Sequence, residues 1–303
     1  MKRTDFASAL HRYFRDYLIN ERGCSQRTIE TYRYAFIQFI DFMENSQRIR
    51  PEKIELKHIT HKNIQSFLLW LEYERKVSPA TRNQRLAAFK CFATFLKYDL
   101  PECIDDVIQI QNIRMKKSLT KEITYVKPEG IKMLLSQIDR TTQGGKRDFA
   151  MFTLLYATGI RVSELIKIRG RDVSMSAPKH IVIHGKGNKI RHVPIVQQLS
   201  SVLGDYLKET GSMLPQNLDK PIFVNHSDEM FTRQGINHLL SKYVKMARKV
   251  DSSLIPDSCS PHKIRHSTAM AMVENGTDLI IIRDFLGHSS VQTTNPKLKQ
   301  ILN

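Results

Sequence analysis

The chain has 303 residues, of which 41% are hydrophobic and 25% charged, so its composition is that of a globular protein and excludes a disordered chain. Its 13 glycines exclude a collagen-like or silk-like fibre. Lys and Arg total 47 against 30 Asp and Glu, and the resulting net charge of +17 favours a polyanionic partner.

The apolar runs and the cysteines of the chain exclude a membrane protein and a disulfide-stapled one. The chain carries no apolar run of the ~20 residues that a membrane span requires. Residues 1–5 lead into a mixed polar helix pattern without the apolar segment and cleavage site of a signal peptide, so we expect a cytoplasmic protein with no membrane contact. The four cysteines lack metal-ligand spacing and lie far apart, so we expect reduced thiols and no metal site.

The excess of positive charge is spread over both halves of the chain. Residues 1–120 carry 21 basic and 14 acidic side chains, and residues 121–303 carry 26 and 16. A polyanion contacted by both halves accounts for this distribution, and nucleic acid is the first candidate. A basic protein without such a partner is the alternative.

The first 110 residues show apolar side chains at helical spacing and no strand pattern. Gly23 ends the first helix, Ser25 is placed to cap the second, and Ser78 with Pro79 begins the fourth. The apolar residues fall in four segments, 6–18, 29–43, 64–71 and 86–96. We therefore predict an all-helical domain over residues 1–111 with its aromatic side chains in the core. Residues 112–124 lose periodicity and gain charge, which predicts a linker.

Residues 125–303 mix helical and strand patterns, which predicts an α+β domain with a small sheet. Apolar residues alternate in 180–184 and 190–195 on either side of a turn of glycine, lysine and asparagine, a pattern typical of a hairpin. Helices are expected over about 128–138, 146–156, from 162, and around 232–249, 262–275 and 278–286. The whole chain is then mainly α with a small β-sheet. Neither a P-loop nor a GxGxxG fingerprint is present, so we expect no nucleotide cofactor.

Seven basic side chains are candidates for contacts to DNA. Basic side chains near helix starts and on hairpins hold phosphates and read base edges. The seven are Arg27 and Arg33 in the second helix, Arg82, Arg85 and Lys90 in the fourth, and Lys189 and Arg191 in the hairpin. For any one of them, a solvated surface position is the alternative.

Four short segments of the second domain form the most specific pattern. They are Ala157–Leu165 (ATGIRVSEL), Gly185–Lys189 (GKGNK), Ser260–His266 (SPHKIRH) and Leu286–Ser290 (LGHSS). In this order, after a basic helical domain, they resemble the tyrosine recombinases, the family of phage-type integrases and Xer site-specific recombinases. The resemblance covers nearly the whole chain. It implies a core-binding domain and a catalytic domain that clamp double-stranded DNA, a homotetramer on DNA, and strand exchange through a 3′-phosphotyrosyl intermediate without cofactor or metal.

The resemblance assigns Arg161, His262, Arg265 and His288 to a cage around the scissile phosphate. Transesterification adds negative charge to the non-bridging oxygens, and a metal-free enzyme has to meet this charge with fixed donors. Arginine is suited to this because its planar fork grips two oxygens and stays protonated. His262 and Arg265 are three residues apart near a helix start, where an anion is already favoured.

By the same resemblance Lys186, at the tip of the hairpin, is the general acid that protonates the leaving 5′-oxygen. Glu164, one turn after Arg161, would orient that arginine or its neighbours in a supporting role. Taken singly, each piece has an ordinary explanation: an Arg-x-x-Glu pair usually lies on a surface, and a Gly-Lys-Gly turn is usually only a turn. The four segments together favour the site.

The family's nucleophilic tyrosine is expected about nine positions after His288, where this sequence has Lys297. Thr293 and Thr294, which typically precede it, are present, and the last tyrosine in the sequence is Tyr243. A covalent phosphotyrosyl intermediate requires the phenol, so we expect this chain to bind DNA without cutting it. A non-catalytic DNA-binding protein on the same fold is therefore the alternative function, and a metal-dependent nuclease that uses the histidines is a weaker one.

Overall fold

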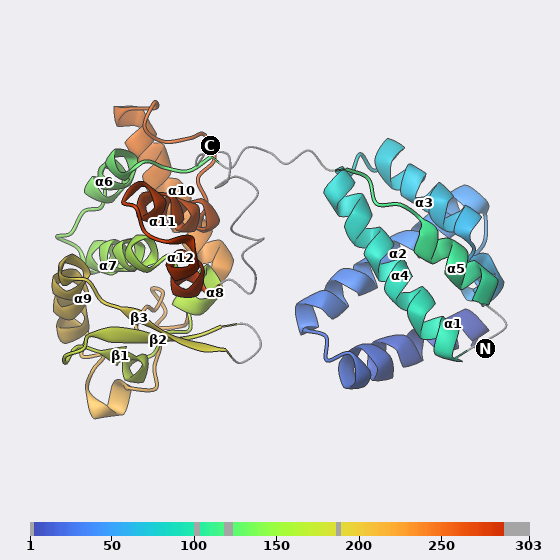
Figure 1. Cartoon of the computed structure of the whole chain (residues 1–303), viewed down its shortest axis with the longest axis horizontal. Coiled ribbons are helices and arrows are strands. Elements are labelled where there is room, and N and C mark those ends of the chain that lie inside the picture. Colours follow the sequence, from blue (N-terminus) through green and yellow to red (C-terminus); the bar gives the residue numbers. More distant parts are fainter. Residues whose placement is uncertain (1–2, 100–103, 118–123, 186–188, 288–303) are drawn as a thin grey trace. The chain divides into compact units, whose positions relative to one another are not determined.

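The structure is a computed structural model that describes residues 3–99, 104–117, 124–185 and 189–287. Its contacts divide the chain into two compact units, Met1–Lys121 and Glu122–Asn303, whose elements are labelled in Figure 1. Each unit has a hydrophobic core of its own.

The first unit contains helices and no strand among its described residues, as predicted. The Ser25 hydroxyl accepts a hydrogen bond from the backbone N–H of Thr28 (3.3 Å), which caps the second long helix. The first predicted helix changes from α to π winding at Tyr13. The elements are α1 (Asp5–Arg12), the π-helix η1 (Tyr13–Glu21), α2 (Gln26–Gln47), the 3-10 turns η2 (Pro51–Lys53) and η3 (Leu56–His58), α3 (His61–Tyr73), α4 (Pro79–Asp99) and α5 (Ile104–Asn112).

Aromatic rings fill the core of this unit. The centroid of the Phe36 ring lies 4.8 Å from that of Phe89 and 5.1 Å from that of Phe92, and the Tyr13 centroid lies 5.1 Å from that of Phe92. All four side chains are fully buried. The prediction that aromatic residues at helical spacing form the core is confirmed. Edge-to-face pairs such as Phe36–Phe92 and Tyr13–Phe92 add stability beyond the area they bury.

Helix α4 is the central helix of the first unit, in contact with α2, α3 and α5. It also binds the chain that follows α5. The Asn83 side chain accepts a hydrogen bond from the Lys116 backbone N–H (3.0 Å) and donates one to the Lys116 carbonyl (2.7 Å). Within α5 itself, the carbonyl of Gln111 accepts a hydrogen bond from the Lys90 ammonium (2.6 Å). Part of the segment predicted to be a linker is therefore bound to α4.

The second unit combines helices with a sheet, as predicted. Helix α9 is missing from the predicted elements, although its buried Leu199, Leu203 and Leu207 recur every four residues. No side chain caps its start, so the usual polar signal is absent there. The helices are α6 (Pro128–Ser136), α7 (Gln143–Thr158), α8 (Val162–Leu165), α9 (Gln197–Glu209), α10 (Arg233–Val250), α11 (Pro261–Glu274) and α12 (Leu279–Leu286), with 3-10 turns η5 (Gly170–Asp172) and η6 (Pro215–Asn217).

The sheet is antiparallel, with three strands in the order β1-β2-β3 among the described residues. The hairpin is the predicted one, and β1 adds a short strand. The register of β2 and β3 sets Arg191 opposite Ile183 and Val193 opposite Ile181. Directly opposed residues share a face, so Arg191 lies on the same face as these three buried apolar residues. The strands are β1 (Val173–Ser174), β2 (His180–His184) and β3 (Ile190–Pro194).

Helix α7 is central to the second unit and contacts both α9 and α11, and α11 in turn contacts α12. Figure 1 shows α8, α11 and α12 gathered near the carboxyl end of α7. This gathering positions the residues of the candidate site. Within the described part of the chain, no helix combines the length and the apolar character needed to cross a membrane.

Candidate active site

Arg161 stands at a sharp turn between α7 and α8. Gly159 ends α7 with a φ of +56°, and its N–H donates to the Leu155 carbonyl (3.0 Å). A Cβ at position 159 would lie 2.6 Å from a methyl group of Leu286, so both the backbone conformation and the close approach of α12 require glycine. Arg161 then takes the N-cap position of α8, with 39% of its side chain exposed.

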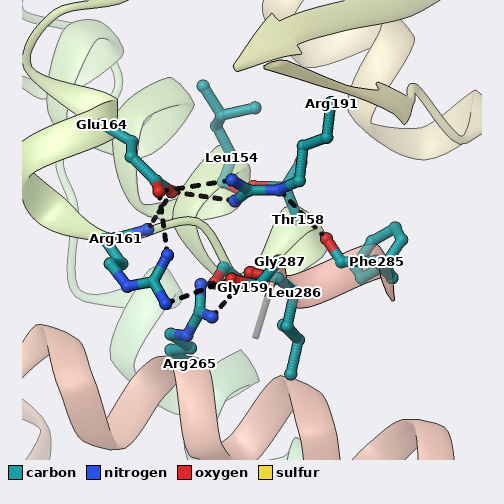
Figure 2. Close-up of polar contacts among 10 residues, drawn as sticks. All are labelled: Leu154, Thr158, Gly159, Arg161, Glu164, Arg191, Arg265, Phe285, Leu286 and Gly287. Carbon is teal, nitrogen blue, oxygen red and sulfur yellow. Dashed lines mark hydrogen bonds and ion pairs between the residues drawn. The ribbon is translucent and has the colours of Figure 1, made fainter. Parts of the chain in front are cut away.

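Glu164 is a buried carboxylate shared by two arginines (Figure 2). Its Oε1 accepts hydrogen bonds from Nη1 of Arg161 (3.0 Å) and Nη1 of Arg191 (3.2 Å). Its Oε2 accepts from Nη2 of Arg191 (2.8 Å) and from the backbone N–H of Arg161 (2.9 Å). Burial alone would raise the pKa of Glu164, but these hydrogen bonds, led by those from Arg191, hold it below its ordinary value. The carboxylate is therefore ionised at neutral pH.

Arg265 comes from α11 and is only 3% exposed. Its Nη1 donates to the carbonyl of Gly159 (2.5 Å) and its Nη2 to the carbonyl of Leu286 (2.6 Å), which joins the ends of α7 and α12. Burial, followed by the charge of Arg161, lowers the pKa of Arg265 to about 9. The guanidinium is therefore still protonated at neutral pH.

The carboxyl end of α12 accepts hydrogen bonds from arginines of three different elements. The last carbonyls of a helix lack partners within it and carry the negative end of the helix dipole, so cations are favoured there. The pairs are the Phe285 carbonyl with Arg191 (3.3 Å), the Leu286 carbonyl with Arg265 (2.6 Å) and the Gly287 carbonyl with Arg161 (3.3 Å), as Figure 2 shows. We call Arg161, Arg191 and Arg265, together with Glu164, the arginine cluster.

His262 and His266 lie one turn apart on α11, which begins at a serine N-cap and a proline. Their rings meet edge to face with centroids 4.4 Å apart. Burial, with the charges of Arg265 and Arg161, lowers the pKa of His262 below its ordinary value. Burial and the neighbouring His262 lower the pKa of His266 to about 4. Both rings are therefore neutral at pH 7, and a neutral imidazole both donates and accepts a hydrogen bond.

Three positions of the predicted site, Lys186, His288 and Lys297, lie outside the described residues. The described chain reaches Gly185 at the end of β2 and Gly287 at the end of α12. The structure thus brings together the arginines and the first histidine of the sequence pattern, and it leaves the predicted general acid and the second histidine as expectations.

The seven basic side chains predicted to contact DNA fall into three groups. Arg27, Arg33 and Lys189 are exposed. Three others have partners within the first unit. Arg82 forms an ion pair with Glu72 (3.4 Å), Arg85 donates a hydrogen bond to Gln38 (2.7 Å), and Lys90 donates one to the Gln111 carbonyl (2.6 Å). Arg82 and Arg85 are each 8% exposed, because the surrounding helices leave α4 no open basic face at these positions. The seventh, Arg191, lies in the arginine cluster.

Sequence reasoning missed the positions of Arg191 and His266. Along β3 and the residue that follows it, Arg191 shares its parity with the buried Val193 and Ile195, and residues of one parity point to one face of a sheet. That parity was the available signal for an inward-facing arginine. His266 follows His262 by four residues, which places both rings on one face of the helix.

The arginine cluster is suited to an anion. Three guanidinium groups against one carboxylate leave two positive charges uncompensated while the histidines are neutral. Guanidinium groups pair with phosphate oxygens in a fixed geometry and keep their charge. Over the described ranges, no group of three or more His, Cys, Asp or Glu side chains could hold a metal ion.

Known protein families match both units of the chain. The Phage integrase family matches residues 124–296. The phage integrase N-terminal SAM-like domain matches residues 10–102. Together the two matches cover most of the sequence, and the first contains the whole arginine cluster.

Individual proteins match over most of their length. A putative integrase/recombinase of Sinorhizobium fredii, y4rC, is 32% identical over 99% of this chain and 90% of its own. The tyrosine recombinase XerD of Listeria innocua is 33% identical over 93% of this chain and 90% of its own. The solved structure of XerH site-specific recombinase bound to palindromic difH substrate shares the fold, with a TM-score of 0.70 over 93% of this chain and 80% of that chain at 20% identity.

Proposed function

The chain belongs to the phage integrase family of tyrosine recombinases, and from this membership we propose that it binds double-stranded DNA and holds a backbone phosphate at the arginine cluster. One observation carries the proposal. Arg161 and Arg265, far apart in the sequence, meet at neighbouring carbonyls of the α12 end, where their charges outnumber the single carboxylate. The structure of the Tn1549 transposon integrase in complex with transposon right end DNA, which shares the fold, supports DNA as the ligand.

The proposed roles follow from exposure and charge. Arg161 has the more accessible guanidinium and contacts a non-bridging oxygen directly, while Arg265 supplies a fixed charge beneath it. Neutral His262 offers a hydrogen bond to a second oxygen. In the complete site Lys186 protonates the leaving 5′-oxygen and His288 adds a further donor. Each of these groups acts on the phosphate without a metal.

The position of the nucleophile separates two versions of this function. With Lys297 where the family has tyrosine, that position offers no phenol to form the phosphotyrosyl bond. We propose that it recognises and holds DNA while strand transfer is blocked. A regulator or inactive recombinase on the same fold is the second candidate function, and the lysine is the observation that favours it.

The proposed organisation gives both domains a share of the DNA. Residues 1–111 form the core-binding domain, 112–124 the linker and 125–303 the catalytic domain, and the protein assembles as a homotetramer on DNA in the cytoplasm. The exposed Arg27 and Arg33 of the first unit and Lys189 of the second supply phosphate contacts. Contacts to several phosphates make the affinity strongly dependent on salt.

A salt titration of DNA binding tests the proposal. The full chain, its Arg161→Gln variant and a matched Arg171→Gln variant are titrated into a fluorescein-labelled duplex at several salt concentrations. Arg171 is an arginine of the same unit whose side chain is 57% exposed and paired with Asp219, away from the cluster. We expect R161Q to weaken binding and to reduce the slope of log K against log salt by about 0.9, the value for one lost phosphate contact. An R161Q slope equal to those of R171Q and the unchanged chain refutes the assignment of the cluster.

A further inference from the structure

Arg191 faces the interior of the second unit although it lies on an edge strand of the sheet. Its register partner Ile183 and its neighbour two residues on, Val193, are both buried on the same face. Only 15% of its side chain is exposed. An arginine at such a position needs partners for its charge, because an unpaired buried cation is costly.

Its partners are all groups of the candidate site. The two terminal nitrogens of Arg191 grip both oxygens of Glu164, at 3.2 and 2.8 Å, in a forked arrangement. Its Nε donates to the carbonyl of Phe285 at the end of α12 (3.3 Å). The guanidinium and Cδ of Arg191 lie beside Gly287, where an added Cβ would come within 3.0–3.1 Å of these atoms.

These contacts link the hairpin to Arg161 through one carboxylate. Glu164 receives the fork of Arg191 on one side and the guanidinium and backbone N–H of Arg161 on the other. We propose that Arg191 is a positioning residue: it fixes Glu164, and through it the guanidinium of Arg161, and it ties the end of α12 to the sheet. This inference rests on the proposed function, because it takes Arg161 to be the phosphate ligand.

The competing assignment is the direct DNA contact predicted from the sequence. Three hydrogen bonds to protein groups and the low exposure of the side chain count against it. Lys189, two residues before Arg191 in the hairpin, is exposed instead and is the better candidate for a DNA contact.

The first test measures the carboxylate itself. In the full chain labelled with ¹³C at the glutamate carboxyl groups, the Glu164 signal is identified by its loss in Glu164→Gln, and its pKa is read from a pH titration. We expect the pKa of Glu164 to rise in Arg191→Met and to rise less in Arg191→Lys, which keeps the charge but loses the fork. The matched Lys189→Met variant leaves it unchanged. If R191M does not fold, the test is made with R191K. An unshifted Glu164 pKa in R191K overturns the positioning role of Arg191.

The second test is a double-mutant cycle in DNA affinity. If Arg191 acts through Glu164, R191M weakens binding to the labelled duplex about fivefold or more in the unchanged chain and less than about twofold in the E164Q background. An equal loss in both backgrounds, with a salt slope lowered by about 0.9, assigns Arg191 to a phosphate and overturns the proposal. Failure of the unchanged chain to bind DNA refutes the proposed function instead. The titration of the Glu164 carboxylate then still decides whether Arg191 positions Glu164.

Discussion

Acidification is expected to destabilise the second unit through His266. The pKa of this ring is lowered to about 4 by burial and by the neighbouring His262 and Arg265, whereas an unfolded histidine has a pKa of about 6.5. Below pH 6.5 the unfolded chain therefore binds a proton at this ring that the folded chain does not bind. The free energy of unfolding decreases as the pH is lowered, down to about pH 4, where both states are protonated. Between pH 7 and pH 5 these two pKa values give a loss of about 2 kcal/mol, which partial solvent access reduces to about 1–2 kcal/mol.

The assay compares the full chain with His266→Gln by urea unfolding at pH 5, 6, 7 and 8. Circular dichroism follows both units, while fluorescence of Trp70, the only tryptophan, follows the first unit alone. The stability difference between the two proteins should shrink by about 1–2 kcal/mol from pH 7 to pH 5. His192→Gln, which changes an exposed histidine of β3 in the same unit, is the control for the loss of a histidine elsewhere. An H266Q protein with the same pH dependence as the unchanged chain would show that the ring is not held neutral.

Three further predictions concern the backbone, the first unit and the chemistry. Gly159→Ala should lower the free energy of unfolding by about 1–3 kcal/mol and weaken DNA binding, because a Cβ at a φ of +56° meets Leu286 at 2.6 Å. Thermal unfolding measures the loss of stability and the duplex titration the loss of affinity, and an unchanged Tm would contradict the prediction. Arg85→Gln should destabilise the first unit with little change in the salt slope of DNA binding, whereas the exposed Arg27→Gln should reduce the slope with little change in stability; the reverse result would make Arg85 the DNA contact. A nicked suicide duplex should trap no covalent adduct on a denaturing gel with Lys297 in place, and an adduct would show that another group is the nucleophile.

The sequence predicts the elements that local signals mark. Serine caps and the helical spacing of aromatic residues delimit the helices of the first unit, and glycine and asparagine in the turn mark the hairpin. Helix α9 lacks a capping side chain, so only its leucine spacing was available to find it. The four motifs identify the family because their order, and not any one of them, is specific.

The functions of individual basic residues are harder to predict, because they depend on which face is covered. Helix α4 has neighbours around it, so Arg82 and Arg85 face Glu72 and Gln38 instead of an open surface. Periodicity along one helix carries no information about the helices that surround it. For Arg191 the parity of the strand pointed inward, but its partner Glu164 lies in another element and only the tertiary structure supplies it.

The three carbonyls at the end of α12 make the two ends of this helix unequal in their tolerance of length changes. Consecutive helical residues point in directions about 100° apart. An inserted or deleted residue before Phe285 would therefore turn each carbonyl away from the arginine that it serves. Residues added before Asp278, by contrast, precede the helix, because the Asp278 carboxylate caps the start of α12. They leave the positions of the three carbonyls relative to the arginines unchanged. Insertions in relatives of this chain should accordingly accumulate in the α11–α12 connection and stay out of the helix itself.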